Sequence, residues 1–156
     1  MVIPVEPELK ELRFRQKLLA DPATMSYNHA WGGTIPFPES EWEEWYTHWL
    51  IRHDNKRFYR YLRDTETDAF VGEIAYHRDE DRGIWLANVI VAAECRGRGY
   101  GTEGLRLLCE AARENGVRVL RDDIAADNPA IGLFLKAGFT EEYRTEQIIM
   151  LKKTLQ

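Results

Sequence analysis

Residues 89–101, V-I-V-A-A-E-C-R-G-R-G-Y-G, join an apolar, strand-like run to a stretch rich in glycine and arginine. Arg96 and Arg98 supply positive charge, and the glycines let backbone amides approach a ligand closely. The residues that follow have helical spacing, and the first turn of a helix leaves N–H groups unpaired at the positive end of its dipole. The stretch therefore predicts an anion site that a pyrophosphate would fit.

Outward from this stretch, the apolar spacing alternates between helical and strand-like patterns. Three strand-like runs joined by short polar turns predict an antiparallel meander before residue 92. After it come a helix, a strand, a helix and a strand, so the chain is expected to form a mixed-sheet α/β (α+β) fold. The expected strands are 58–63, 70–77, 84–91, 117–124 and 146–154; the expected helices are 9–20, the segment opened by a capping box at Ser40 and Glu43, 105–114, and the segment opened by Asn128 and Pro129.

Composition narrows the function. The chain has 156 residues, which fits a single domain over 1–156, and a net charge of -5, which disfavours a general nucleic-acid or anionic-membrane surface. No apolar run reaches membrane-spanning length. The two cysteines, Cys95 and Cys109, have neither metal-ligand spacing nor a disulfide framework. These features predict a cytoplasmic protein without a metal site.

One competing interpretation is dinucleotide binding. Gly99, Gly101 and Gly104 spell G-x-G-x-x-G, and the acidic pair 122–123 follows where a ribose-binding carboxylate would stand. However, residues 92–98 separate the strand from the first glycine, a meander precedes the motif, and only one strand–helix pair follows the first helix. A doubly wound sheet is therefore disfavoured.

The better match is a resemblance to the GNAT superfamily of N-acyltransferases. Arg96, Gly99 and Gly101 fit its Q/R-x-x-G-x-G/A pattern, and residues 128–139, N-P-A-I-G-L-F-L-K-A-G-F, look like its second block. The resemblance implies a mostly antiparallel sheet of about six or seven strands with about four helices and a splayed parallel strand pair at the coenzyme A site. It further implies acetyl-CoA as the cofactor and a direct transfer of the acetyl group to a primary amine.

The resemblance also implies which residues hold the cofactor. Backbone amides of 96–102 would bind the pyrophosphate, and the pantetheine arm would pair with the splayed strand, where an N–H near Val91 would polarise the thioester carbonyl. The cofactor-binding residues expected on this basis are Val89, Ile90, Val91, Arg96, Gly97, Arg98, Gly99, Tyr100, Gly101, Thr102, Asn128, Phe134 and Lys136.

The reacting amine needs a base or a water relay, because a free alkylamine has a pKa of about 10.4. Trp85 and Ala87, which stand where some relatives carry a proton acceptor, cannot fill this role. The expected catalytic residues are Glu73, on the second strand, and His29, on a loop. His77, Asp122 and Asp123 are the alternatives.

The acceptor, a small-molecule or peptide amine, is expected to bind near the N-terminal third. Tyr27, Trp31 and Glu73 are the expected substrate-binding residues, because aromatic faces with carboxylates suit a cationic amine. The tryptophans at helical spacing, Trp45 and Trp49, are expected to belong to the core.

Phe134 departs from the family pattern, which often has tyrosine there to protonate the leaving thiolate. A thiol has a pKa of about 8.5, so its thiolate leaves with little help, or Tyr100, Tyr143 or water supplies the proton. The alternative is a silent module that binds acyl-CoA without chemistry. A homodimer through an exposed last strand is a further expectation.

Overall fold

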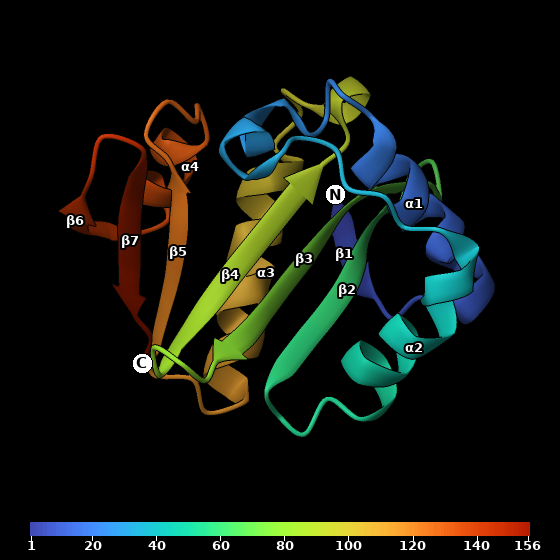
Figure 1. Cartoon of the computed structure of the whole chain (residues 1–156), viewed down its shortest axis with the longest axis horizontal. Helices are drawn as coiled ribbons and strands as arrows, with labels where there is room; N and C mark the ends of the chain where they lie inside the picture. The colour runs from blue at the N-terminus through green and yellow to red at the C-terminus, as the bar shows by residue number, and fades with distance from the viewer.

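A seven-stranded sheet runs through the molecule in the order β1-β2-β3-β4-β5-β7-β6 (Figure 1). The computed structural model describes the backbone of residues 1–156 and all side chains except those of Ala30 and Trp31. The strands are β1 (Val2–Val5), β2 (Arg57–Asp64), β3 (Phe70–Asp79), β4 (Ile84–Val91), β5 (Val119–Ala125), β6 (Thr140–Arg144) and β7 (Ile148–Thr154). All neighbouring strands are antiparallel except β4 and β5, so the predicted meander and mixed α/β sheet are confirmed.

Four α-helices and several short turns accompany the sheet. The α-helices are α1 (Leu12–Ala20), α2 (Trp42–Tyr46), α3 (Tyr100–Glu114) and α4 (Ile131–Lys136). The 3-10 turns are η1 (Leu9–Glu11), η2 (Ser26–Trp31), η3 (Glu39–Glu41) and η5 (Ala93–Cys95), and α2 continues into a π-helical turn, η4 (Thr47–Ile51).

Alternate residues of the central strands face two separate cores. On one face, Leu62 and Ile74 pack with the buried side of α3, which lies behind the sheet in Figure 1. On the other face, Tyr59, Tyr61 and Ala75 pack with aromatic side chains from the N-terminal helices. This second, aromatic face forms the floor beneath the N-terminal third of the chain.

The parallel strands β4 and β5 touch only at their beginnings. Their register holds just two pairs, Trp85 with Leu120 and Leu86 with Arg121, and the strands then diverge towards the loop before α3 (Figure 1). The splay predicted for this pair is therefore confirmed. It leaves the β5-facing edge of β4 without a neighbouring strand beyond Leu86.

Three details differ from the sequence predictions. The short strands β1 and β6 were not predicted, because each carries only four or five residues. Ser40 does not cap α2, which instead continues directly from η3 with no side-chain capping bond. The last strand, β7, lies between β5 and β6, so its edges are paired and the predicted dimer contact through it is wrong.

The described helices are too short or too polar to cross a lipid bilayer.

Candidate active site

A cavity of about 840 Å³ occupies the space opened by the splay of β4 and β5. One end is formed by the loop before α3, and the other by the N-terminal helices over β2 and β3. The residues predicted to hold a cofactor and those predicted to bind an acceptor therefore line one continuous space. Its size is in the range of small-molecule sites.

The loop before α3 presents a run of free backbone amides. The N–H groups of residues 97–102 donate no hydrogen bond within the described structure, whereas Glu103 N–H already bonds to the Gly99 carbonyl. Gly97 and Gly99 have φ of 78° and 85°, a conformation in which side chains are strained. No atom lies within 4 Å of a Cβ built on either glycine, so the space in front of the loop is open. Six amides at a helix N-terminus fit a diphosphate.

The two loop arginines differ in what they contact. The Arg96 guanidinium donates to the carbonyl of Thr24 at 2.7 Å and to that of Ala23 at 3.3 Å, which fastens the loop to the N-terminal segment. Arg98 is exposed and makes no ion pair with the described side chains. Arg98 is thus the freer of the two charges for a phosphate.

The backbone of β4 is oriented as an extended ligand would require. Ala92 N–H donates to the Val71 carbonyl, on the β3 side of the strand. Because successive N–H groups of a strand point to opposite sides, those of Val91 and Val89 face the gap next to β5. Ile90 contributes differently: its backbone faces β3, and its side chain packs in the core under the N-terminal helices.

The remaining predicted cofactor residues divide into those on the cavity wall and one outside it. Thr102, Asn128 and Phe134 line the cavity. The Asn128 side chain accepts the Ala130 N–H at 2.8 Å, so its capping role is real and only its amide NH₂ remains for a ligand. Tyr100 lines the cavity, but its hydroxyl donates to Asp64. Lys136 is exposed on α4 and is not part of the wall.

Glu73 lies on the cavity floor in an ion pair that the sequence analysis missed. Its side chain is 0% exposed, and Arg15 Nη1 donates to both carboxylate oxygens, at 2.7 and 2.8 Å. The signal for this pair was present in the sequence, because Arg15 lies three residues after Leu12 and four before Leu19, on the apolar side of α1. An arginine there needs a buried partner, and Glu73 is that partner.

Aromatic rings surround the Arg15 guanidinium. Its central carbon lies 4.6 Å from the Trp45 ring centre, 5.1 Å from that of Phe37 and 5.5 Å from that of Tyr59. Burial lowers the pKa of Arg15, but Glu73 and Tyr59 outweigh this effect and the pKa is raised overall. The guanidinium is therefore charged at every physiological pH.

The floor next to Glu73 is made by alternate residues of β3 and β4. His77 and Asn88 line the cavity on this face, whereas Trp85 and Ala87 pack in the opposite core with α3. The positions compared with the relatives in the sequence analysis were therefore one residue out of step. Burial lowers the pKa of His77, so its imidazole is neutral at pH 7, and its ring packs edge-on against Trp49.

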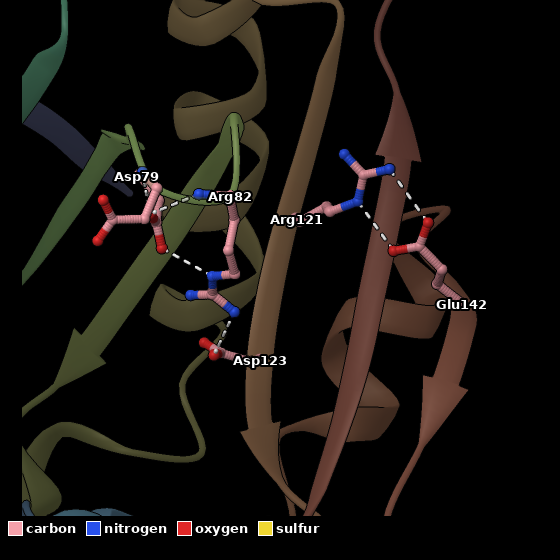
Figure 2. Close-up of polar contacts among 6 residues, drawn as sticks. Asp79, Arg82, Arg121, Asp123 and Glu142 are labelled. Atoms are coloured by element: carbon pink, nitrogen blue, oxygen red, sulfur yellow. Dashed lines mark hydrogen bonds and ion pairs between the residues drawn. The ribbon is translucent and has the colours of Figure 1, made fainter.

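The two aspartates of β5 are in different environments. Arg82, from the β3–β4 turn, donates to Asp79 at 2.7 Å and reaches Asp123 at 3.5 Å, while Arg121 pairs with Glu142 (Figure 2). These contacts tie β5 to its neighbours at the closed end of the splay. Asp122 lies on the cavity wall without such a contact, and burial, followed by the Asp123 charge, raises its pKa well above the usual 3.8.

The predicted N-terminal residues reach the cavity from η2. Tyr27 lies on the wall, and burial, Glu73 and Asp122 together raise its pKa, so its hydroxyl keeps its proton. His29 Nε2 is 3.0 Å from Asp127 Oδ2, and this exposed pair joins η2 to the loop after β5. The side chain of Trp31, also predicted to bind substrate, lies outside the described residues.

Comparison with known proteins agrees with this geometry. The sequence description of the Acetyltransferase (GNAT) family matches residues 19–139, more than half of the chain. An uncharacterized N-acetyltransferase of Bacillus subtilis, YobR, is 38% identical over 60 residues, which are 35% of this chain and 23% of YobR. The chain thus matches about a quarter of that relative's length.

Solved structures share the fold at low identity. An N-acetyltransferase from Staphylococcus aureus Mu50 superposes with a TM-score of 0.79 at 17% identity, covering 100% of this chain and 99% of that one. A spermidine N-acetyltransferase from Vibrio cholerae, solved with CoA and spermine, has a TM-score of 0.77 at 21% identity, covering 98% and 95%. With the family match, the open loop amides and the splayed strands, the chain belongs to the GNAT family of acetyltransferases, as the sequence predicted.

Proposed function

We propose that this chain transfers an acetyl group from acetyl-CoA to a primary amine. The observation that carries the proposal is the row of six free amides, residues 97–102, at the mouth of a cavity that continues between β4 and β5. The diphosphate of CoA would bind these amides, and the pantetheine arm would lie along β4. In this arrangement the thioester ends near Val91, beside the floor made by β3 and β4.

The reaction is a direct transfer. The amine nitrogen attacks the thioester carbon, a C–N bond forms, the C–S bond breaks, and its electron pair leaves with the sulfur. An N–H of Val91 or Val89 would hold the negative charge that develops on the carbonyl oxygen. The nitrogen gives up one proton to a base, and the thiolate takes one from water, so CoA leaves as the thiol.

We propose that the base is a side chain on the cavity floor. Glu73 and His29 were predicted from the sequence, but Arg15 already donates to both oxygens of Glu73, and His29 lies at the exposed rim beside Asp127. His77 has a neutral imidazole on the same strand and the same face as Glu73. His77 is therefore the base we favour, with Glu73 and His29 as the alternatives.

Phe134 cannot protonate the leaving thiolate. The tyrosines considered in its place are poorly suited, because the Tyr100 hydroxyl is bonded to Asp64 and Tyr143 is exposed on β6, away from the cavity wall. Since the thiolate of CoA is a good leaving group, water is a sufficient proton donor. We also place the protein in the cytoplasm, where its two cysteines, both unpaired, would stay reduced.

Two measurements test the proposal. Acetyl-CoA, and CoA itself, should raise the melting temperature, whereas NAD should not, because a ligand stabilises the state that it binds. Thiol release with a panel of amines should then show turnover. Tight CoA binding without thiol release from any amine would instead support a silent module.

The base is identified by pH profiles of kcat/KM for His77→Gln, Glu73→Gln and His29→Gln. Loss of His77 should abolish the acidic limb of the profile and lower kcat about 100-fold or more. The assignment to His77 is wrong if its variant keeps the wild-type profile while one of the other two loses that limb.

A further inference from the structure

The acceptor end of the cavity already contains a cation. Arg15 fills the aromatic box of Phe37, Trp45 and Tyr59, and its Nη1 neutralises Glu73. From the sequence, the aromatic rings and the Glu73 carboxylate were expected to bind a cationic amine. In the structure an ammonium group at this position would lie against a guanidinium and find its carboxylate taken.

Polar atoms at this end of the cavity are left without partners. Arg15 uses only Nη1, so its Nε and Nη2 donate to no described atom, and Nε is fully buried. The Tyr59 hydroxyl is also buried and makes no hydrogen bond, although Tyr59 is only 1% exposed and lines the cavity. Buried polar groups in native proteins nearly always have a partner, so unpaired ones on a cavity wall indicate a ligand.

The free atoms define the chemistry of that ligand. Nε and Nη2 form the edge of the guanidinium that carries two parallel N–H groups, which matches the two oxygens of a carboxylate. Burial, followed by the nearby Glu73, raises the pKa of Tyr59, so the hydroxyl remains a donor. All three groups therefore offer protons, and they call for an acceptor of hydrogen bonds rather than for another donor.

We infer that the amine acceptor carries a carboxylate, as an amino acid does, and that Arg15 and Tyr59 bind this group while the amine faces the thioester. The inference rests on the proposed acetyl transfer and names its substrate class. Other carboxylates on the wall do not oppose it strongly, because Asp123 is held by Arg82 and Asp127 by His29. Glu73, the nearest, is already neutralised by Arg15.

The test compares acceptors that differ only in the carboxylate. A series of α- to ω-amino acids is assayed with acetyl-CoA next to the alkylamines of the same chain length, with spermidine as a cationic comparison. We expect the best amino acid to exceed its matched alkylamine at least about tenfold in kcat/KM, since hydrogen bonds between charged groups are strong. The corresponding carboxylate without an amine should inhibit competitively against the amino acid.

Tyr59→Phe removes a hydroxyl that has no partner in the protein. It should raise KM for the amino acid about fivefold, with little change for the matched alkylamine or in melting temperature. Tyr61→Phe is the matched control, because the Tyr61 hydroxyl is used internally, donating to the Glu11 carbonyl at 2.7 Å and accepting Arg15 N–H at 3.2 Å. That variant should lose stability and keep the wild-type preference among acceptors.

The results separate the inference from the function on which it rests. Turnover of alkylamines or spermidine as good as that of every amino acid would overturn the inference and leave acetyl transfer standing. An unchanged amino-acid KM in Tyr59→Phe would also overturn it. Failure of all amines, with acetyl-CoA still bound, would overturn the proposed function itself.

Discussion

The two ends of the cavity are built in different ways. The end that meets α3 is made of backbone: six consecutive amides, residues 97–102, face open space, and the conformation depends on glycines with positive φ. The opposite end is made of side chains from α1, α2, β2 and β3, in which Arg15, Glu73 and three aromatic rings hold one another. The first end comes from one short stretch of sequence, and the second from segments up to 58 residues apart.

This contrast explains why one site was found in advance and the other was misjudged. Backbone donors do not depend on which side chains surround them, so a local motif is enough to describe the site. A charged side chain means something different once its partner is known. Glu73 alone suggests a base or a cation site, whereas Glu73 paired with Arg15 suggests neither.

The largest effect is expected from breaking the side-chain end. Arg15→Met leaves the Glu73 carboxylate buried without a partner, and the loss of one member of a buried ion pair costs about 3–5 kcal/mol. Urea denaturation should show this loss in the free energy of unfolding. Adding Glu73→Gln to Arg15→Met removes the stranded charge and should restore most of the stability. If the single variant is as stable as wild type, the pair does not hold this end together.

The backbone end is tested by Gly99→Val. The φ of 85° at this position is unfavourable for a branched side chain, and strain of about 1–3 kcal/mol corresponds to a loss of roughly 5- to 150-fold in acetyl-CoA affinity, measured by calorimetry. Gly116→Val is the matched control, because Gly116 has φ of 86° just after α3 and lies outside the cavity wall. It should lower the melting temperature without weakening acetyl-CoA binding. Equal effects on binding would contradict a specific role for the loop.

The smallest effect concerns Asp122, which lies between the two ends. Its pKa is raised in the folded state, so folding favours the protonated form, and the stability present below the unfolded pKa is lost as the pH rises through the folded pKa. Asp122→Asn should therefore melt at a higher temperature than wild type at pH 8, and the difference should vanish near pH 3.5. A variant that is less stable than wild type at pH 8 would show that the carboxylate has a partner in solution.

Much of the architecture could be read from local patterns. The meander, the long helix after the loop and the strand–helix–strand ending follow from apolar spacing and turn residues, which act over a few neighbours. The strands β1 and β6 were beyond that reach: each is short, and β6 is exposed throughout, so neither carries a burial pattern. The position of β7 inside the sheet likewise depends on β6.

The site shows the same division. The loop, the splay beyond Leu86 and the wall positions of Asn128 and Phe134 agree with expectations drawn from motifs. Which face Trp85 and Ala87 occupy could not be derived, because a one-residue error in strand phase exchanges the two faces.

The sequence by itself determined the sheet-and-helix order, the family and the backbone anion loop, because each depends on residues close together in the chain. Only the tertiary structure decided the charge at the acceptor end. It packs Arg15 of α1 against Glu73 of β3 and surrounds the guanidinium with aromatic rings. Pairing between distant buried charges depends on the three-dimensional packing, and no local pattern encodes it.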